Sequence, residues 1–485
     1  MNEATLNYVR QHADDDVRQL ALRGCKDTDV DLPLALQQIQ GRQTAKRKLP
    51  SWAAVEGVLY PPRLSMEQCS SEATACYKTG IIYNLHIYDL RFDSSVGGAA
   101  QIVNRKNCQI VNGQSLNCKS VNGQSVNHKS VNGQSVNGQS VNRQSVNRKS
   151  VNRKSVNRKL IDLTGGFGVD LAFMSQAFDE TVYVERSEEL CRLAAHNMPL
   201  VTTTPVTVVC ADGIEYMKAM GRCTMLFLDP ARRDGKGART YALADCTPNV
   251  VPVIGDLLGK ADSVMLKLSP MLDWRKAVND VGAQHVSQVH IVAVDNECKE
   301  LLLLLQQEAP PMQLFCVDID SATLPTQKAE ASAASIFTVV PAIPVASVGA
   351  GPVPARPPKV PVAPSRFLYE PNAAIMKAGC FEALTQQFSV SPLAHDSHLF
   401  VSDNGVEDFP GRRFVIDAVT SMNKRELKAT LGHLRQANIT VRHFPLSAEE
   451  LRKRLRLADG GNDYIFATTL SDGSHILLLC HKDIP

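Results

Sequence analysis

The stretch Asp162-Leu-Thr-Gly-Gly-Phe-Gly-Val-Asp170 follows a short apolar run and leads into a helical pattern. Its glycines, Gly165, Gly166 and Gly168, remove Cβ atoms where the chain must turn tightly and let a ligand approach the backbone at a helix N-terminus. A structural turn is the plainer explanation, and a dinucleotide site is the rival, although G-x-G-x-x-G is absent. The stretch therefore predicts a strand, a turn and a helix with a candidate ligand site.

Short apolar or β-branched runs alternate with helical patterns from this turn onward. The candidate strands are Leu160–Thr164, Thr181–Glu185, Val206–Cys210, Thr224–Asp229, Ser263–Leu268, Val289–Val294 and Gln313–Asp318. Alternation at this spacing is typical of βαβ units. We therefore expect an α/β fold built on a doubly wound, mainly parallel, Rossmann-like sheet.

The regions on either side of this sheet have different patterns. Before it, Val17–Leu22 and Leu32–Gln40 predict an N-terminal helical segment, and Ser71 is a candidate N-cap for a further helix. After Arg366 a second α/β pattern begins. We expect strands over Arg412–Ala418, Ile439–Phe444, Tyr464–Thr469 and His475–Cys480, and helices over Lys424–Ala437 and Ala448–Leu457. This pattern predicts a small C-terminal α+β domain.

Acidic residues mark the ends of the first four candidate strands. Glu185 ends the second strand, where a carboxylate can accept both ribose hydroxyls of a nucleoside. Asp212 follows the third strand, where it can contact an adenine edge, and Asp229 ends the fourth. Open α/β sheets bind ligands at the carboxyl ends of their strands, so these residues form one candidate site together with Asp162.

The ordered set resembles the motif series of class I S-adenosylmethionine (SAM)-dependent methyltransferases. The D-x-x-G-G-x-G turn, the acidic end of strand two, the A-D-G after strand three and the D-P after strand four all match. A closer likeness is to a bacterial group that joins this fold to a C-terminal THUMP-like domain. The segments that resemble this group are Glu67–Glu72, Asp229–Arg233, Lys267–Asp273, Asn296–Leu301 and Ala437–Arg442.

The resemblance implies a cofactor, a substrate and roles for individual residues. It implies SAM as cofactor and RNA as partner, with no metal, and methylation of a base amine or ring nitrogen. The implied cofactor-binding residues are Asp162, Thr164, Gly165, Gly166, Gly168, Glu185 and Asp212, and the implied catalytic residues are Asp229, Pro230 and Arg232. A covalent cysteine route is disfavoured because Lys267-Leu-Ser-Pro270 stands where such enzymes place the cysteine.

Some basic residues keep two interpretations. Ala231 and Arg232 stand in place of the third and fourth residues of a D-P-P-Y segment, so its aromatic platform is missing. Arg232 and Arg233 either clamp substrate phosphates or pair with nearby acids. Lys267 either contacts substrate or snorkels from a strand end. The basic residues of the C-terminal domain either present RNA or form solvated helix faces.

A five-residue unit, Ser-Val-Asn-Gly/Arg-Gln/Lys, repeats between Val103 and Lys159. One small apolar residue per unit cannot offset the cost of ordering the backbone, so composition favours a solvated insert over a pentapeptide β-helix. Its charge is entirely basic, and without it the rest of the chain has an excess of acidic residues. The overall charge is therefore no argument for a nucleic-acid enzyme.

We divide the 485 residues into six regions. They are an N-terminal helical region (1–97), the repeat insert (98–159), the SAM-binding domain (160–325), a Pro/Ala-rich linker (326–365), a small ferredoxin-like or connecting segment (366–406) and the THUMP-like domain (407–485). The 13 cysteines are scattered singly, which supports neither a disulfide framework nor a zinc site. With neither a secretory signal pattern nor an apolar run of membrane length, we expect a cytoplasmic protein.

Three functional classes remain open on the sequence alone. A SAM-dependent methyltransferase is the first, a nucleotide-dependent oxidoreductase that binds NAD is the second, and a non-catalytic RNA-binding relic of the fold is the third. The choice of cofactor separates the first two. Loss of cofactor binding would indicate the third.

Overall fold

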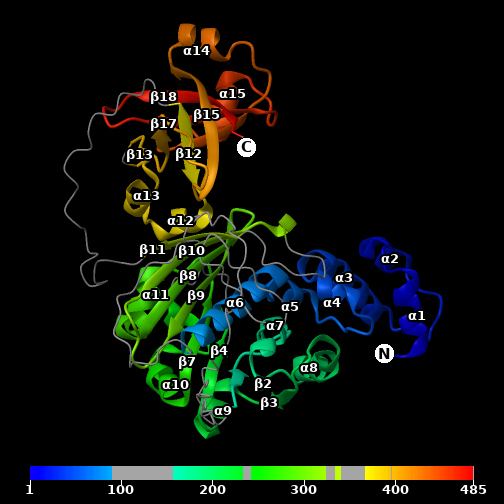
Figure 1. Ribbon diagram of the computed structural model, residues 1–485. Helices are drawn as coiled ribbons and strands as arrows, with labels where there is room; N and C mark the ends of the chain where they lie inside the picture. The colour runs from blue at the N-terminus through cyan, green and yellow to red at the C-terminus, as the bar shows by residue number, and fades with distance from the viewer. Residues whose placement is uncertain (90–156, 233–241, 324–333, 340–365, 395, 484–485) are drawn as a thin grey trace, which may run out of the picture.

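The computed structural model describes residues 1–89, 157–232, 242–323, 334–339, 366–394 and 396–483 (Figure 1). Nearly all of the expected repeat insert and most of the expected linker lie outside these residues. Among the described residues, no helix combines the length and the apolarity needed to cross a membrane.

The larger sheet has nine strands in the order β11-β10-β8-β9-β7-β4-β1-β2-β3. Their bounds are β1 Lys159–Asp162, β2 Glu180–Glu185, β3 Val206–Cys210, β4 Cys223–Leu228, β7 Ala261–Leu268, β8 Val286–Val294, β9 Glu297–Leu305, β10 Gln313–Ile319 and β11 Ala334–Val339. Only β9 and β11 run antiparallel to their neighbours in this sheet. The predicted mainly parallel α/β sheet is confirmed.

The strand β9 was not predicted. Its apolar run, Leu301–Leu305, is continuous because both faces of this strand are buried, so the period of two that marks a half-exposed strand is missing. It inserts between β7 and β8 and brings Glu300 into the middle of the sheet.

Helices cover both faces of this sheet and divide the core into two layers. Successive strand residues alternate between them: Leu226 and Leu228 pack into one layer, Met225 and Phe227 into the other. The first layer is closed by α9 Gly213–Ala219, α10 Ile254–Lys260 and α11 Trp274–Val281. The second is closed by α7 Val169–Met174, α8 Glu188–Val201 and the N-terminal helices.

Most of the N-terminal helices are therefore part of the main core. The N-terminal helices are α1 Glu3–Gln11, α2 Val17–Arg23, α3 Leu32–Lys48, α4 Pro50–Ala54, α5 Arg63–Gln68 and α6 Glu72–Asp89. The end of α3 with α4, α5 and α6 packs on the sheet, while α1 and α2 extend away from it (Figure 1). The amide of Asn197 in α8 bonds both backbone groups of Leu59 at 2.8 and 2.9 Å, which fixes the segment between α4 and α5. Ser71 accepts from the Thr74 amide at 3.3 Å, as expected of an N-cap.

The second sheet has seven strands in the order β13-β14-β12-β15-β18-β17-β16. Its elements are β12 Phe367–Pro371, α12 Ala373–Ala378, α13 Phe381–Phe388, β13 Ser391–Pro392, β14 Phe400–Ser402, β15 Gly411–Ser421, α14 Lys424–Leu431, β16 Asn438–Arg442, α15 Ala448–Leu455, β17 Asp463–Thr469 and β18 His475–Lys482. The expected small α+β domain is confirmed, although α14 ends at Leu431, six residues before the expected end.

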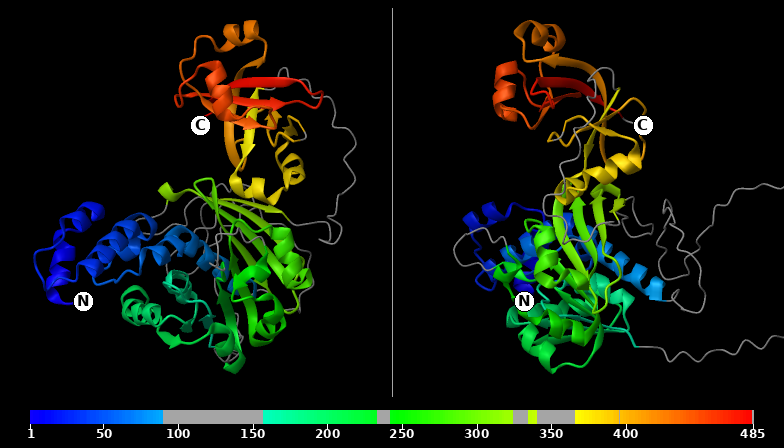
Figure 2. Two further views of the ribbon diagram at one scale, coloured as in Figure 1. Left: turned by 180° about the vertical axis from the view of Figure 1, so that it is seen from behind. Right: turned by 90° about the vertical axis from the view of Figure 1, so that its left-hand side faces the viewer.

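The C-terminal region stands on the edge of the large sheet where the parallel strands end (Figures 1 and 2). Lys377 in α12 donates to the carbonyl of Leu272, in the loop after β7, at 2.8 Å. The Ala373 amide donates to Asn296 Oδ1, in the turn after β8, at 2.8 Å. The second sheet is thus mounted on the edge at which ligands of open α/β sheets bind.

Candidate active site

The glycine turn after β1 is tightly packed at two positions and open at the third. A Cβ on Gly165 would lie 2.3 Å from the Tyr183 ring, and a Cβ on Gly168, whose φ is +84°, would lie 2.2 Å from Met198 Cε. Gly166 also has a positive φ, +54°, but a Cβ there would meet nothing nearer than Thr164 O at 3.7 Å. Gly165 and Gly168 therefore serve packing, whereas Gly166 faces space that a ligand can occupy.

Glu185, at the end of β2, is hydrogen-bonded to this turn. Its Oε2 accepts from the Gly166 amide at 3.0 Å, and its Oε1 accepts from the Ser187 amide at 2.9 Å. Two backbone donors hold the carboxylate in one orientation and leave further lone pairs on both oxygens. The structure thus brings together two residues that the sequence analysis assigned to one ligand.

Thr164 connects the ends of β1 and β4. Its amide donates to Asp162 Oδ1 at 2.9 Å, and its hydroxyl oxygen accepts from the Asp229 amide at 2.6 Å. Asp162 is almost fully buried, 1% exposed, and no cation pairs with it among the described residues. Burial raises the pKa of Asp162 to about 8, opposed by the Thr164 amide and reinforced by Asp170, Asp229 and Glu185.

Asp212 lies at the start of a helix, and the D-P segment leads into a short strand. Asp212 is exposed and is the N-cap of α9, where its Oδ1 accepts from the amides of Ile214 at 2.9 Å and Glu215 at 3.1 Å. Its contact with an adenine edge stays a prediction. Pro230 is buried directly after Asp229. Arg232 lies in the short strand β5 Ala231–Arg232, which pairs with β6 Cys246–Thr247, but its side chain and all of Arg233 lie outside what the structure describes.

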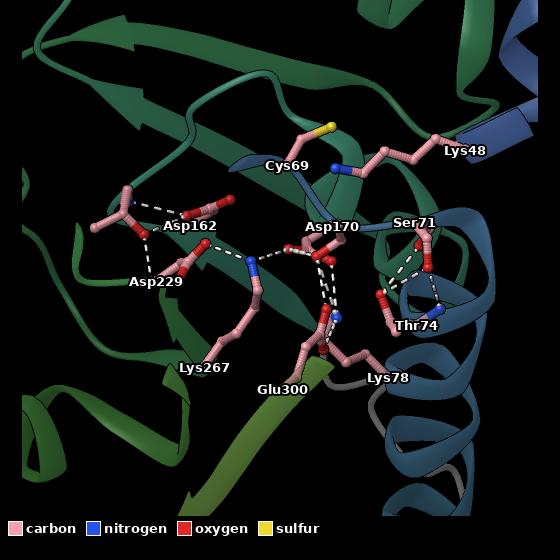
Figure 3. A network of polar contacts seen from close by, with 12 residues as sticks. Lys48, Cys69, Ser71, Thr74, Lys78, Asp162, Asp170, Asp229, Lys267 and Glu300 are labelled. Carbon is pink, nitrogen blue, oxygen red and sulfur yellow. Dashed lines mark hydrogen bonds and ion pairs between the residues drawn. The ribbon is translucent and has the colours of Figure 1, made fainter. Parts of the chain in front are cut away.

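A buried group of charges lies beside this site (Figure 3). Lys267, on β7, forms an ion pair with Asp229 and lies 3.4 Å from Asp170 Oδ2. Lys78, on α6, lies 3.1 Å from Asp170 Oδ1 and forms an ion pair with Glu300 of β9. We call these five residues the lysine cluster. Neither lysine is exposed by more than 9% at its side chain, so the snorkelling alternative for Lys267 is wrong.

The cluster contains three carboxylates and two ammonium groups. Burial alone would lower the pKa of Lys267, but Asp229, Asp170 and Glu300 outweigh it and raise the pKa well above its usual value. Burial would likewise raise the pKa of Asp170, but Lys78 and Lys267 hold it below its usual value. With both lysines charged, the group has an excess of negative charge when all three carboxylates are ionised. Asp229 is its opening to solvent, with a side chain 37% exposed.

The N-terminal region supplies further polar groups at this point. The Ser70 hydroxyl lies 2.8 Å from Asp170 Oδ2 and 3.0 Å from Glu300 Oε1. Lys48 Nζ donates to the carbonyls of Met66 at 3.0 Å and Glu67 at 2.7 Å, at the end of α5. Burial lowers the pKa of Lys48 and raises that of the neighbouring Cys69 thiol. The segment Glu67–Glu72, which the resemblance singled out without a role, is thus anchored in the site.

Four residues of the site were given no role from the sequence: Ser70, Lys78, Asp170 and Glu300, of which Asp170 appeared only as the last residue of the quoted turn. Ser70 and Glu300 fall in segments quoted only for their resemblance. A signal for two of the charged residues existed in hindsight, since Lys78 stands before the apolar pair Ile81 and Ile82, and Glu300 stands directly before Leu301. Charged residues placed within apolar runs are rarely buried without a partner.

Comparisons with known proteins agree with this architecture. Residues 411–482 match the family model of a THUMP domain-like family, and residues 367–410 match that of a ferredoxin-like domain. A crystal structure named as a "putative methyltransferase" from Porphyromonas gingivalis W83 is 26% identical, covers 99% of this chain and 98% of its own, and superposes with a TM-score of 0.70. No curated protein matches the chain.

A SAM-dependent methyltransferase from Agrobacterium tumefaciens is a more distant match. It is 16% identical, covers 32% of this chain and 57% of its own, and has a TM-score of 0.24, too low to carry an argument. The full-length match defines the class: this is a chain with a methyltransferase-type α/β fold. More particularly, it carries a ferredoxin-like and a THUMP-like domain after that fold.

Proposed function

We propose that this protein is a SAM-dependent methyltransferase that acts on a base amine or ring nitrogen of RNA. The observation that carries the proposal is the meeting of Glu185, Gly166 and Asp229 at one edge of the sheet. Thr164 joins the two halves of this edge, since it binds the Asp229 amide and begins the glycine turn. A nucleoside held by the turn therefore lies next to an acceptor position at the end of β4.

The residues of the turn suit SAM. The open space at Gly166 would admit the cofactor, and the Glu185 carboxylate can accept its ribose hydroxyls. We assign the adenine edge to Asp212 at the start of α9. Asp162 is a buried carboxylate without a cation, so a cationic ligand group nearby would favour its ionised form. When bound, SAM supplies an electrophilic methyl group, so the protein's task is to align a nucleophile and exclude water.

Asp229 and Pro230 form the acceptor side. The ion pair with Lys267 fixes the Asp229 carboxylate while leaving it partly exposed, so it can accept an N–H bond from a substrate amine. Burial raises the pKa of Asp229 and the Lys267 ion pair opposes that rise, so it is the geometry of this pair that gives Asp229 the role of an orienting acceptor. Burial raises the pKa of Cys69, the cysteine nearest the cluster, which supports a route without a thiolate nucleophile.

RNA is supported by the C-terminal region. A THUMP-like domain is of an RNA-binding kind, and it stands on the edge of the sheet that holds Asp229 and Lys267. An RNA bound to that domain would extend towards the site. The NAD-dependent oxidoreductase and the non-catalytic relic remain the rival classes, and ligand binding separates all three.

The test compares the parent with Asp229→Asn and with Asp256→Asn, which removes an exposed carboxylate on α10 as a matched control. Calorimetry with SAM, S-adenosylhomocysteine and NAD identifies the cofactor, and tritiated SAM with total RNA measures transfer. We expect Asp229→Asn to bind SAM and to lose about 10²-fold or more in turnover, because the amine is no longer held in line.

Each other outcome removes a specific part of the proposal. Binding of NAD in place of SAM would identify an oxidoreductase, and binding of neither would favour the relic. Label in protein or metabolites alone would remove RNA as substrate. Equal turnover of parent and Asp229→Asn would remove Asp229 from the mechanism.

A further inference from the structure

A polar cavity of about 350 Å³ lies between α2, α3 and α5, outside the candidate active site. Each of these helices contributes one arginine to its wall: Arg18, Arg47 and Arg63, respectively. The amide side chains of Gln37 and Gln40 add neutral hydrogen-bonding groups. Three arginines in the wall of one hollow are an arrangement suited to a phosphate, which arginine binds with two parallel N–H groups.

The charges of this cavity are only partly satisfied within the protein. Glu67 is the one acidic residue of its wall, and its Oε1 accepts from Arg63 Nε at 2.6 Å. Neither Arg18 nor Arg47 forms an ion pair with a carboxylate among the described residues. The wall therefore carries an excess of two positive charges, in a chain whose sequence outside the basic repeat is acidic overall.

The cavity is connected to the active site through α5. Arg63 and Glu67 line the cavity from this helix, and Lys48, the neighbour of Arg47, donates to the Met66 and Glu67 carbonyls at the end of the helix. Two residues beyond α5, Ser70 is hydrogen-bonded to Asp170 and Glu300. These contacts link the cavity wall to the active site through packed and hydrogen-bonded residues, so a phosphate bound there would lie at a set distance from Asp229.

We propose that this cavity binds a backbone phosphate of the RNA strand that carries the methylated base. The proposal rests on the proposed function for the identity of the strand. The cavity lies on the N-terminal helices, apart from the THUMP-like domain, and so adds a second anchor for the strand. Two anchors on rigid elements would set which base reaches Asp229.

The experiment uses the full chain and a fluorescein-labelled single-stranded oligoribonucleotide, with anisotropy read from about 0.05 to about 0.5 M KCl. The test variant is Arg18→Gln/Arg47→Gln. The control is Arg10→Gln/Arg23→Gln, which removes the same charge from the same region outside the cavity. We expect the test variant to lose about tenfold in affinity at low salt and to show a shallower salt slope by about one, while the control stays close to the parent.

Two competitors and one cofactor titration complete the design. Inorganic phosphate or a mononucleotide that displaces the oligonucleotide at equal concentration would overturn the proposal in favour of a small-anion site. Equal RNA affinity of parent, test variant and control would overturn it outright. Calorimetry with SAM should give the same affinity for parent and test variant. A parent that fails to bind SAM would refute the proposed function. Normal SAM binding together with unchanged RNA binding in the test variant would refute only the role of the cavity.

Discussion

Two regions of this molecule bury carboxylates against cations, and they do so in different ways. In the lysine cluster, Lys78 and Lys267 lie inside the protein with 0% and 9% of their side chains exposed. In the C-terminal sheet, Glu370 of β12 is 3% exposed and is paired with Arg412 and Arg442, which are 39% and 33% exposed. We call these last three residues the arginine cluster.

The arginine cluster is a structural brace. Arg412 of β15 donates through Nε to Glu370 Oε2 at 2.8 Å, and Arg442 of β16 donates through Nη2 to Oε1 at 2.7 Å. Each carboxylate oxygen has its own donor, and both arginine side chains are partly exposed, which lowers the cost of burial. Glu370 lies within residues 367–410 and both arginines lie within 411–482, so the cluster joins the ferredoxin-like and THUMP-like parts.

The lysine cluster differs in charge balance and in its opening. It has more carboxylates than cations, and one of them, Asp229, faces the candidate site. An excess of negative charge beside a site favours cationic ligands, which agrees with a sulfonium cofactor. The difference teaches that a cluster with an excess of cations whose side chains reach water can hold parts together, whereas an enclosed cluster with an excess of carboxylates has negative charge left over for a ligand.

The largest effect is expected from Lys78→Met. It leaves Glu300 buried without its ion-pair partner and Asp170 with Lys267 alone, so the free energy of unfolding should fall by about 3–5 kcal/mol. Urea denaturation measures this loss. The control is Lys276→Met, which breaks an exposed pair with Asp280 at 3.0 Å and should cost less than about 0.5 kcal/mol.

A second variant keeps this prediction decidable if Lys78→Met does not fold. Lys78→Met/Glu300→Gln removes one carboxylate with its cation and should recover part of the lost stability. Equal stability of the parent and Lys78→Met would show that Lys78 does not support the cluster.

The second effect comes from Asp162, a buried carboxyl with no cation to pair with among the described residues. Its pKa is about 8 in the folded protein and near 3.8 when exposed, so the folded state holds a proton that the unfolded state has released. Stability is therefore fullest below about pH 4 and is lost as the pH rises to about 8, by up to about 1.4 kcal/mol per pH unit.

Asp162→Asn should remove this dependence. The asparagine oxygen can still accept from the Thr164 amide, so the turn is kept. The melting temperature of the variant, measured without ligand, should exceed that of the parent by more at pH 8 than at pH 5. A constant difference across this range would mean that Asp162 titrates at an ordinary pKa.

The sequence indicated one half of the candidate site and gave no role to the other half. The glycine turn, Glu185 and Asp229 were found because each ends a strand of a regular α/β pattern, which fixes the edge on which they meet. Lys78 and Glu300 were not found because they are 222 positions apart, and no local pattern encodes their contact. The contact depends on α6 folding back onto β9. That strand was not predicted, because its apolar run is continuous and lacks the alternation of a half-exposed strand.

Glu370→Gln tests the brace and should have a smaller effect than Lys78→Met. The glutamine keeps one oxygen acceptor but presents an NH₂ group to the other arginine, so we expect a loss of about 1–3 kcal/mol. The arginines can rehydrate at their exposed faces, which limits the cost. Urea denaturation, followed by the fluorescence of a label on the C-terminal sheet, measures the loss of unfolding free energy. A loss as large as that of Lys78→Met would mean that water does not solvate the arginines once their partner is changed.

The smallest effect is expected from Arg442→Lys. The lysine keeps a positive charge near Glu370 Oε1 but gives up the planar fork, while Arg412 still donates to Oε2. Because the Arg442 side chain is 33% exposed, solvent screens much of the pair, and the free energy of unfolding should fall by less than about 1 kcal/mol. Arg442→Met, which removes the charge as well, should cost more in the same denaturation experiment. If Arg442→Lys lowers the free energy of unfolding as much as Glu370→Gln, the planar shape of the guanidinium group matters more than its charge for joining the ferredoxin-like and THUMP-like parts. The arginine cluster would then depend on hydrogen-bond direction, whereas the lysine cluster does not.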